Sequence, residues 1–318
     1  MLLLATLLLS PGPSRAEALR GAEVDAFIAR MAQEHGFAPG QLRAVLSRAR
    51  IEQRILDAIS RPAEAKPWHE YRRIFLTPAR MEQGVAFARR HAGLLEQAER
   101  RWGVPPEVIT AIIGVETFYG RHTGGYRVID ALSTLAFAYP PRSGFFRREL
   151  EQFLLLTRDA GLDPLQPTGS YAGAMGIPQF MPSSYRSYAV DFDGDGVADI
   201  WQDPGDAIAS VANYLGRHGW RRGGPVAVPV RGVPPQAVLD RGLEPHTPLS
   251  RLRLLGISPD REVPGDPEAA VIALQQPDHL EYWFGFRNFH VITRYNRSPL
   301  YAMAVWQLAE RIREGLGR

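Results

Sequence analysis

The stretch from Val104 to Arg121, which reads VPPEVITAIIGVETFYGR, predicts a helix that is buried on every side. Pro105 and Pro106 suit the first turn of a helix, where backbone N–H groups have no acceptor within the helix. The residues that follow are apolar around the whole circumference, which is typical of a helix inside a protein core. We therefore expect the rest of the chain to be organised around this helix.

A carboxylate, Glu116, stands at the end of this apolar run, on the face of Ile112 and Ile113. Burying a carboxylate is costly, and burial raises its pKa so that the group stays partly protonated near neutral pH. A general acid needs that property. The alternative is a glutamate at a helix end that reaches solvent or pairs with Arg121, and the helix by itself leaves both interpretations open.

Composition excludes several classes of protein. The chain has 318 residues, 45% of them hydrophobic and 22% charged, as in soluble globular proteins with a sizeable core. Its net charge is +3, but it contains no basic run of the kind that binds nucleic acid, so we expect no nucleic-acid partner. It contains no cysteine, which excludes disulfides, thiolate metal sites, a catalytic thiol and a lipid-modified N-terminal cysteine.

The N-terminus reads MLLLATLLLS followed by PGPSRA. This pattern is typical of a signal-peptide core that ends at a small-residue cleavage site near Ala16, and it is too short to span a bilayer. We predict a signal peptide over residues 1–16, export to the periplasm as a protein that is not a lipoprotein, and no transmembrane domain in the mature chain. The alternative is a cytoplasmic protein with an apolar N-terminus.

The remaining chain divides into a helical body and one β-containing stretch. Apolar spacing and helix-start signals predict helices within 23–58, 77–102, 145–160, 204–217 and 298–312. From residue 223 to 278 the chain is rich in proline and glycine, and short apolar runs predict strands at 226–230, 252–255 and 269–274. Residues 280–286 predict a further strand. We interpret this stretch as a small β-containing insert in a helical protein.

An acidic loop carries the sharpest local pattern, DFDGDG over residues 191–196. Its alternating oxygen ligands and its glycine match an EF-hand-like calcium loop, in which the seventh position supplies a backbone carbonyl. The twelfth position holds Gln202 where a glutamate is expected, and Asp206 in the next helix could close a longer loop. We predict a structural Ca²⁺, favoured over Mg²⁺ because so many protein oxygens are available. The alternative is a surface turn without metal.

A second constellation, SYAGAMGIPQFMP over residues 170–182, combines small residues with polar and aromatic ones. Small residues let the backbone approach a ligand closely, and Ser170, Gln179 and the aromatic rings offer the hydrogen bonds and flat faces that sugars require. Tyr295, Asn296 and Tyr301 surround a helix start further along the chain. The alternative is a tightly packed loop for the first pattern and ordinary capping and packing for the second.

Five stretches in this order resemble one known family: residues 114–120 (GVETFYG), 170–184, 191–201, 207–215 (AIASVANYL) and 295–306 (YNRSPLYAMAVW). Together they resemble the membrane-bound lytic murein transglycosylase B family, glycoside hydrolase family 103, from about Gly21 to the C-terminus. The resemblance implies a mainly α (α+β) fold with a lysozyme-like helical core. It places an N-terminal helical domain over 17–102, the core with its calcium loop over 103–222 and 287–318, and the small β-containing domain over 223–286.

The resemblance also implies an activity and a set of site residues. The family cleaves the β-1,4 bond between N-acetylmuramic acid and N-acetylglucosamine in peptidoglycan glycan strands and leaves a 1,6-anhydromuramoyl end, so it is a carbon–oxygen lyase. By position, Glu116 matches its single catalytic acid/base. The residues that match its glycan cleft are Ser170, Gln179, Phe180, Tyr214, Tyr295, Asn296 and Tyr301. The residues that match its calcium loop are Asp191, Asp193, Asp195, Val197 and Asp206.

Glu116 has no obvious partner carboxylate at helical spacing, although most glycosidases use two. We therefore expect a mechanism with one carboxylate, in which the substrate's N-acetyl group assists and the muramic C6 hydroxyl attacks in place of water. We expect a monomer without an organic cofactor. Two alternatives stay open, namely a lysozyme-type muramidase that uses water and a second acid, and a non-catalytic peptidoglycan-binding protein.

Overall fold

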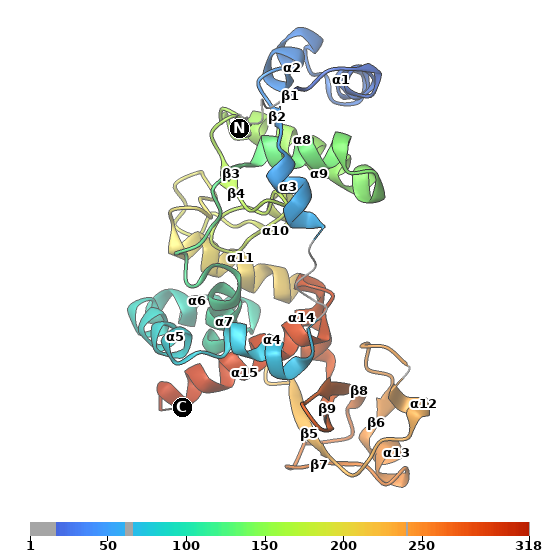
Figure 1. Cartoon of the computed structure of the whole chain (residues 1–318). Coiled ribbons are helices and arrows are strands. Elements are labelled where there is room, and N and C mark those ends of the chain that lie inside the picture. The colour runs from blue at the N-terminus through green and yellow to red at the C-terminus, as the bar shows by residue number, and fades with distance from the viewer. Residues whose placement is uncertain (1–16, 61–65, 240, 318) are drawn as a thin grey trace, which may run out of the picture. The chain divides into compact units, whose positions relative to one another are not determined.

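The computed structural model describes residues 17–60, 66–239 and 241–317, which form two compact units (Figure 1). Unit 1 contains residues 17–60, 126–167 and 171–173, and unit 2 contains the other described residues. The predicted signal peptide over residues 1–16 lies outside the described residues. The domain boundaries that the sequence suggested stay a prediction.

Unit 1 is mainly helical. Its helices are α1 (Ala22–His35), α2 (Pro39–Leu46), α3 (Gln53–Ile59), α8 (Val128–Ala138) and α9 (Ser143–Asp159), with the short 3-10 helix η2 (Pro140–Arg142) before α9. Its strands are β1 (Glu17–Ala18) and β2 (Arg50–Ile51), which pair antiparallel, and β3 (Tyr126–Arg127). The buried residues of α1, α2 and α3 are apolar, as the helical spacing within 23–58 predicted. Those of α9 are mostly apolar, as predicted within 145–160, and α8 and α9 also bury polar side chains.

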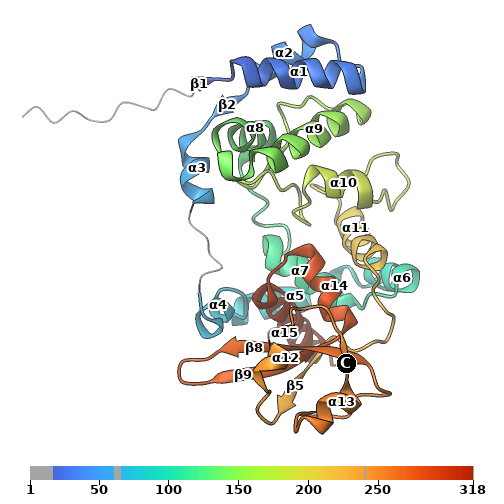
Figure 2. The ribbon, with the colours of Figure 1, turned by 90° about the vertical axis from the view of Figure 1, so that its right-hand side faces the viewer.

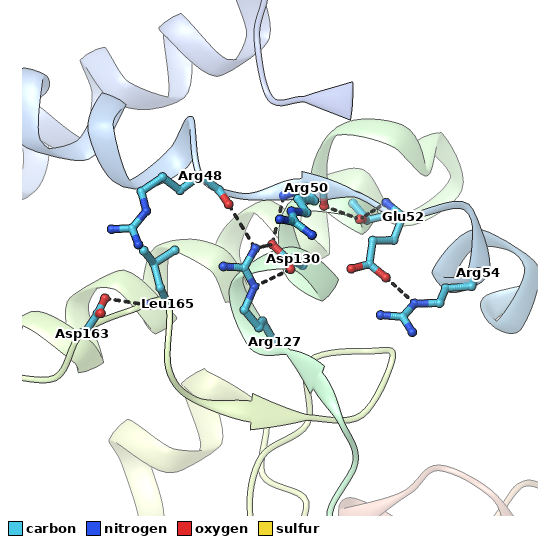
Figure 3. A network of polar contacts seen from close by, with 9 residues as sticks. Arg48, Arg50, Glu52, Arg54, Arg127, Asp130, Asp163 and Leu165 are labelled. Carbon is cyan, nitrogen blue, oxygen red and sulfur yellow. Dashed lines mark hydrogen bonds and ion pairs between the residues drawn. The ribbon is translucent and has the colours of Figure 1, made fainter. Parts of the chain in front are cut away.

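A buried carboxylate, Asp130 in the first turn of α8, fastens β2 to that helix (Figure 3). Its oxygens accept hydrogen bonds from Arg127 Nε at 2.7 Å and from the backbone N–H of Arg50 at 2.9 Å. The Arg127 guanidinium also donates to the carbonyl of Arg48 at 3.0 Å. Because a cation and a backbone donor both satisfy the carboxylate, its burial is tolerated.

Unit 2 is built around α7 (Pro106–Thr117), which confirms the buried helix predicted from the apolar run. Ten of its twelve residues are buried, and it packs against α5, α6, α11 and α15. The helices of this unit, besides α7, are α4 (Trp68–Phe75), α5 (Pro78–Arg90), α6 (Ala92–Trp102), α10 (Pro182–Tyr188), α11 (Pro204–Arg217), α12 (Gln236–Leu239), α13 (Leu249–Leu254), α14 (Arg287–Tyr295) and α15 (Pro299–Gly315).

The single helix predicted over 77–102 is wrong, because α5 and α6 are separate helices with a break at His91. His91 has φ −108° and ψ 23°, and its ring packs on Phe87 with the ring centroids 4.5 Å apart. No proline marks the break, and Gly93, two residues after it, is the local signal that the sequence offered.

The β-containing stretch forms a five-stranded antiparallel sheet in the order β6-β8-β9-β5-β7. Its strands are β5 (Ala227–Arg231), β6 (Thr247–Pro248), β7 (Ser258–Pro259), β8 (Glu268–Gln275) and β9 (Leu280–Gly285), and the short strand β4 (Thr168–Gly169) lies outside this sheet. The sheet contacts α4 through β8 and α14 through β9 (Figures 1 and 2). The predicted strands at 226–230, 269–274 and 280–286 are confirmed to within a few residues.

The strand predicted at 252–255 is wrong, because this segment belongs to the short helix α13 and its end. Leu249 and Leu252, three residues apart, are fully buried in the core of the sheet, whereas Leu254 and Leu255 face solvent. A helical spacing of three thus decides the structure here, and the run of apolar letters concealed it. Among the described residues, no helix is both long enough and apolar enough to cross a membrane.

Candidate active site

Helix α7 presents Glu116 in its last turn. The residues before it on the same helix face, Ile112 and Ile113, are fully buried, while Glu116 itself is partly exposed. Glu116 is therefore a carboxylate next to buried apolar residues that solvent can still reach. This is the arrangement that raises the pKa of an acid without sealing the acid from a substrate.

The carboxylate of Glu116 has one close polar partner, Tyr301 on α15. The Tyr301 hydroxyl donates to Glu116 Oε1 at 2.5 Å. Burial raises the pKa of Glu116 to about 7, and the hydrogen bond from Tyr301 opposes this rise. A carboxyl group with this pKa exists in both forms near neutral pH, so it can donate a proton and accept one.

Arg121 does not neutralise Glu116. Its guanidinium donates to the side-chain oxygen of Gln83 at 2.8 Å instead. The charge of no other carboxylate among the described residues contributes to the raised pKa of Glu116. The pairing with Arg121 that the sequence left open is therefore absent, and Glu116 is without a charged partner in the described part of the chain.

Three aromatic rings form a cluster beside this site. The ring centroids of Tyr214 and Tyr295 lie 4.8 Å apart, and the Phe180 ring lies 5.7 and 5.9 Å from them. The hydroxyl of Tyr295 donates to the carbonyl of Pro178 at 2.7 Å, and burial together with the charge of Glu116 raises the pKa of Tyr295. Phe180, which is 2% exposed, packs against both tyrosines from the core.

The polar residues predicted to bind sugar have structural contacts of their own. The Gln179 amide donates to the carbonyls of Thr123 at 3.1 Å and Gly176 at 2.9 Å, and its φ of 53° places it in the left-handed region. The Ser170 hydroxyl accepts a hydrogen bond from the Ala174 N–H at 3.1 Å. Asn296 ends α14 in an extended conformation. None of these contacts extends to Glu116, so sugar binding by these residues stays a prediction.

A strained turn follows Glu116, and the sequence reasoning missed the residues that hold it. Phe118 and Tyr119 have φ values of 51° and 62°, which residues other than glycine rarely adopt. The Tyr119 hydroxyl donates to the carbonyl of Arg80 at 2.7 Å, and Arg80 Nε donates to the carbonyl of Gly114 at 3.0 Å. These bonds hold the end of α7, and with it the backbone that carries Glu116.

Two helical glycines make room for the Tyr119 ring. A Cβ atom on Gly84 would lie 2.5 Å from the Tyr119 hydroxyl oxygen, and one on Gly114 would lie 2.6 Å from it. Glycine inside a helix costs stability relative to alanine, so its presence there indicates a close approach. This pair of glycines is the signal that could have found Tyr119.

Two successive hydrogen bonds join the end of α7 to the acidic loop. The Thr117 hydroxyl donates to the carbonyl of Ile177 at 2.9 Å, and the N–H of Ile177 donates to the carbonyl of Ile200 at 2.9 Å. A Cβ on Gly176 would lie 2.6 Å from that Ile200 oxygen, so only glycine permits this approach. The loop that contains residues 174–181 is thereby held between the site and the acidic loop.

Three carboxylates of the acidic loop converge. Asp191, Asp193 and Asp206 each offer an oxygen within 4.8 Å of the others. Asp206 is 1% exposed, and burial raises its pKa, although its oxygens accept hydrogen bonds from the N–H groups of Phe192 at 2.7 Å and Asp199 at 2.6 Å. A buried carboxylate facing two others is stabilised by a cation, and an all-oxygen donor set suits Ca²⁺.

The other two predicted ligands, Asp195 and Val197, are not part of this group of carboxylates. Asp195 is not one of the three converging carboxylates, and its Oδ1 accepts a hydrogen bond from the N–H of Val197 at 2.8 Å. Val197 would contribute only a backbone carbonyl, and its side chain is 49% exposed. The glycines of the loop, Gly194 and Gly196, have φ values of 81° and 96°, as the tight turn of such a loop requires.

Comparison with known proteins gives consistent similarities. A family model described as Transglycosylase SLT domain matches residues 20–310. Membrane-bound lytic murein transglycosylase B of Escherichia coli (strain K12) is 45% identical over 296 residues, which cover 90% of this chain and 81% of that protein. The crystal structure of soluble lytic transglycosylase SltB1 from Pseudomonas aeruginosa has a TM-score of 0.87 at 52% identity, and the match covers 93% of this chain and 100% of the SltB1 chain. The structure of the Escherichia coli lytic transglycosylase Slt35 in complex with calcium has a TM-score of 0.85 at 44% identity, and the match covers 93% of this chain and 94% of the Slt35 chain.

Proposed function

This chain belongs to the SLT transglycosylase family, and we propose that it is a lytic transglycosylase that cleaves peptidoglycan glycan strands with a single carboxylate. Its fold is the mainly α, lysozyme-like fold of its structural relatives. The observation that carries the proposal is Glu116, a partly exposed carboxylate with a pKa of about 7 at the end of a buried helix. A non-catalytic binding protein has no need for such a group.

In the first step, Glu116 protonates the glycosidic oxygen between N-acetylmuramic acid and N-acetylglucosamine, and the C–O bond of the muramic C1 breaks. The acetamido group of the muramic residue stabilises the positive charge on that carbon. The Tyr301 hydroxyl, 2.5 Å from Oε1, stabilises the carboxylate that this step creates.

In the second step, the same carboxylate removes the proton of the muramic C6 hydroxyl, whose oxygen then attacks C1. The 1,6-anhydro ring closes, and Glu116 is protonated again for the next cycle. No water is consumed, because the leaving sugar takes the first proton and the C6 oxygen replaces the broken bond. A pKa near the working pH serves both steps, since each needs the opposite protonation state.

The glycan lies along residues around Glu116 in this proposal. Tyr301 and Tyr295 contact the sugar at the cleavage point, and Phe180 acts through the tyrosines that it supports, Tyr214 and Tyr295. Ser170, Gln179 and Asn296 offer hydrogen bonds to neighbouring sugars. The wall of phenol rings supplies flat faces of the kind on which sugar rings stack.

The acidic loop binds a structural Ca²⁺ through Asp191, Asp193 and Asp206, with Asp195 and the Val197 carbonyl completing the set. Support comes from the convergence of three carboxylates and from a relative of known structure in complex with calcium. The ion would neutralise the loop and hold the Ile200 carbonyl, and through the Ile177 backbone it would steady Thr117 beside Glu116. Chelation should lower the melting temperature of wild-type protein but not that of Asp206→Asn; an equal response in both proteins would contradict the site.

We also propose a cellular location and an oligomeric state for the protein. A monomer without an organic cofactor, exported to the periplasm, fits an enzyme whose substrate is the cell wall. The relative from Escherichia coli is named membrane-bound.

The test of the function is digestion of purified sacculi followed by mass spectrometry of the released muropeptides. Wild-type protein should release anhydro products, and Glu116→Gln should fold but release none. Retained activity in Glu116→Gln would refute the role of Glu116. Reducing ends in place of anhydro ends would identify a muramidase, and no release by wild-type protein would identify a binding protein.

A further inference from the structure

His218, the residue directly after α11, packs on the aromatic cluster of the site and takes no part in the two proposed steps. Its ring is stacked on the ring of Tyr214, with the centroids 4.1 Å apart and the planes at 26° to each other. Tyr214 lies one helical turn earlier, at the spacing at which two side chains of a helix meet. His218 is partly exposed, so its contact with Tyr214 is not enforced by deep burial.

A hydrogen bond fixes the His218 ring to the same tyrosine. His218 Nδ1 lies 2.7 Å from the backbone carbonyl oxygen of Tyr214, and because a carbonyl can only accept, Nδ1 carries the proton. Burial lowers the pKa of His218 although this bond opposes the effect, so the ring is neutral near neutral pH. His218 is therefore held to both the side chain and the backbone of Tyr214.

The other rings around Tyr214 meet it at steep angles. The rings of Tyr188, Tyr295 and Phe180 lie 4.9, 4.8 and 5.7 Å from it, with interplanar angles of 70°, 61° and 42°. Among the described residues, His218 is thus the one whose ring lies nearly parallel to that of Tyr214. A parallel neighbour restrains the plane of a ring, so we assign this restraint to His218.

Tyr214 in turn holds Tyr295 in two ways. The two rings pack against each other, and the Tyr214 hydroxyl donates to the carbonyl of Arg294, the residue before Tyr295, at 2.5 Å. Burial and then the charge of Glu116 raise the pKa of Tyr295, so Tyr295 belongs to the electrostatic surroundings of Glu116. A contiguous series of contacts therefore leads from His218 through Tyr214 to Tyr295.

The second ring beside His218, that of Tyr188, is fixed independently. Its centroid lies 5.1 Å from that of His218, and Tyr188 ends α10, which packs on α11 (Figure 2). The Tyr188 carbonyl accepts a hydrogen bond from Asn213 Nδ2 at 2.9 Å, and Asn213 Oδ1 accepts one from Trp102 Nε1 at 3.1 Å. Because these bonds keep Tyr188 in place, a small side chain at position 218 would leave a gap beside Tyr214.

We propose that His218 is a positioning residue for glycan binding, which acts through Tyr214 on Tyr295. The inference rests on the proposed function, in which Tyr295 contacts the sugar at the cleavage point. An aromatic pair stabilises its geometry enough that loss of the ring should weaken glycan binding by roughly 2- to 12-fold. A loss that affects the bound substrate and the transition state equally raises KM and leaves kcat unchanged.

Two substitutions separate the ring of His218 from its hydrogen bond. His218→Phe keeps the stacked ring and loses the donor, whereas His218→Asn keeps a donor for the Tyr214 carbonyl and loses the ring. We expect KM to rise roughly 2- to 12-fold in His218→Asn, with kcat unchanged, and to stay close to the wild-type value in His218→Phe. The matched control is His91→Asn, since the His91 ring packs on Phe87, also four residues earlier, and its KM should not change.

Calorimetric titration with solubilised glycan strands measures binding without cleavage, in the Glu116→Gln background. The Kd should rise in His218→Asn by the same factor as KM. A double-mutant cycle then tests the route. His218→Asn should add little to the effect of Tyr295→Leu, because the route is already broken there. It should have its full effect in Ser170→Ala, since Ser170 lies outside the aromatic cluster and bonds the Ala174 N–H.

Three results would overturn the proposal. The first is a Kd of His218→Asn equal to that of its parent, even if its melting temperature is lower, since His218 would then have a structural role only. The second is equal weakening in His218→Phe and His218→Asn. The third is a full effect of His218→Asn in Tyr295→Leu. Binding by wild-type protein without release of anhydro products would refute the proposed activity instead, and the Kd ratios would still decide the role of His218.

Discussion

Replacing Tyr301 by phenylalanine tests how the site sets the proton affinity of Glu116. The change removes the hydroxyl that donates to Glu116 Oε1 at 2.5 Å and keeps the ring, which is 3% exposed. The lost bond stabilises the charged carboxylate, so its removal favours the protonated acid. A hydrogen bond to a charged group contributes roughly 1.5–3 kcal/mol, and 1.36 kcal/mol corresponds to one pKa unit, so the pKa of Glu116 should rise by about 1 to 2 above its present value of about 7.

The assay is kcat/KM against pH on solubilised glycan strands. The first step needs protonated Glu116, so the alkaline limb of the wild-type profile should lie near pH 7. In Tyr301→Phe this limb should move to higher pH by about 1 to 2 pH units. The control is Tyr185→Phe, which removes a hydroxyl that donates to the Ala198 carbonyl at 2.8 Å, and its profile should not move. An alkaline limb that stays in place, or moves to lower pH, in Tyr301→Phe would refute the reasoning.

Three further perturbations follow from the structure. Glu116→Gln should be more stable than wild type above pH 7, by up to about 3 kcal/mol, because the folded pKa of about 7 exceeds the ordinary 4.5 and wild type loses stability as the pH rises between these values. Urea melts at pH 8 and pH 4 check this, and an equal difference at both would contradict it. Gly114→Ala should lower the free energy of unfolding by about 1–3 kcal/mol, since its Cβ would lie 2.6 Å from the Tyr119 hydroxyl oxygen, and Gly93→Ala, with open space, is the matched control. Asp130→Ala should destabilise the protein by about 3 kcal/mol in the same melts, because it leaves Arg127 and the Arg50 N–H without their acceptor, and a loss below about 1 kcal/mol would count against that account.

The sequence predicted those features that depend on local pattern. Residues 108–115 are apolar on every side of the helix, and this pattern predicted α7 as a buried helix. The alternating acids at 191–195 predicted a loop of metal ligands. In the structure, the carboxylates of Asp191 and Asp193 converge with that of Asp206, and Asp195 is not part of this group. Strands β8 and β9 followed from apolar runs between turn residues. Each of these features is decided within a window of a few residues.

What the sequence did not predict depends on contacts between distant segments. The bond between Thr117 and Ile177, the bond between Tyr119 and Arg80, and the meeting of Glu116 with Tyr301 join residues 39 to 185 positions apart. The break at His91 has only Gly93 as a local signal, and the strand prediction at 252–255 is wrong because three leucines in four residues concealed a helical spacing. Resemblance to a family supplied Tyr301 as a site residue, but only the structure shows that its hydroxyl opposes the effect of burial on Glu116.

The central claim is that one carboxylate acts twice and water takes no part in the bond cleavage. Digestion of purified sacculi in water labelled with oxygen-18, followed by mass spectrometry of the muropeptides, tests it most directly. The account predicts anhydro products that are one water lighter than reducing ends and carry no label at the muramic C1. Reducing ends that carry the label would show that water attacked C1, and they would contradict the account.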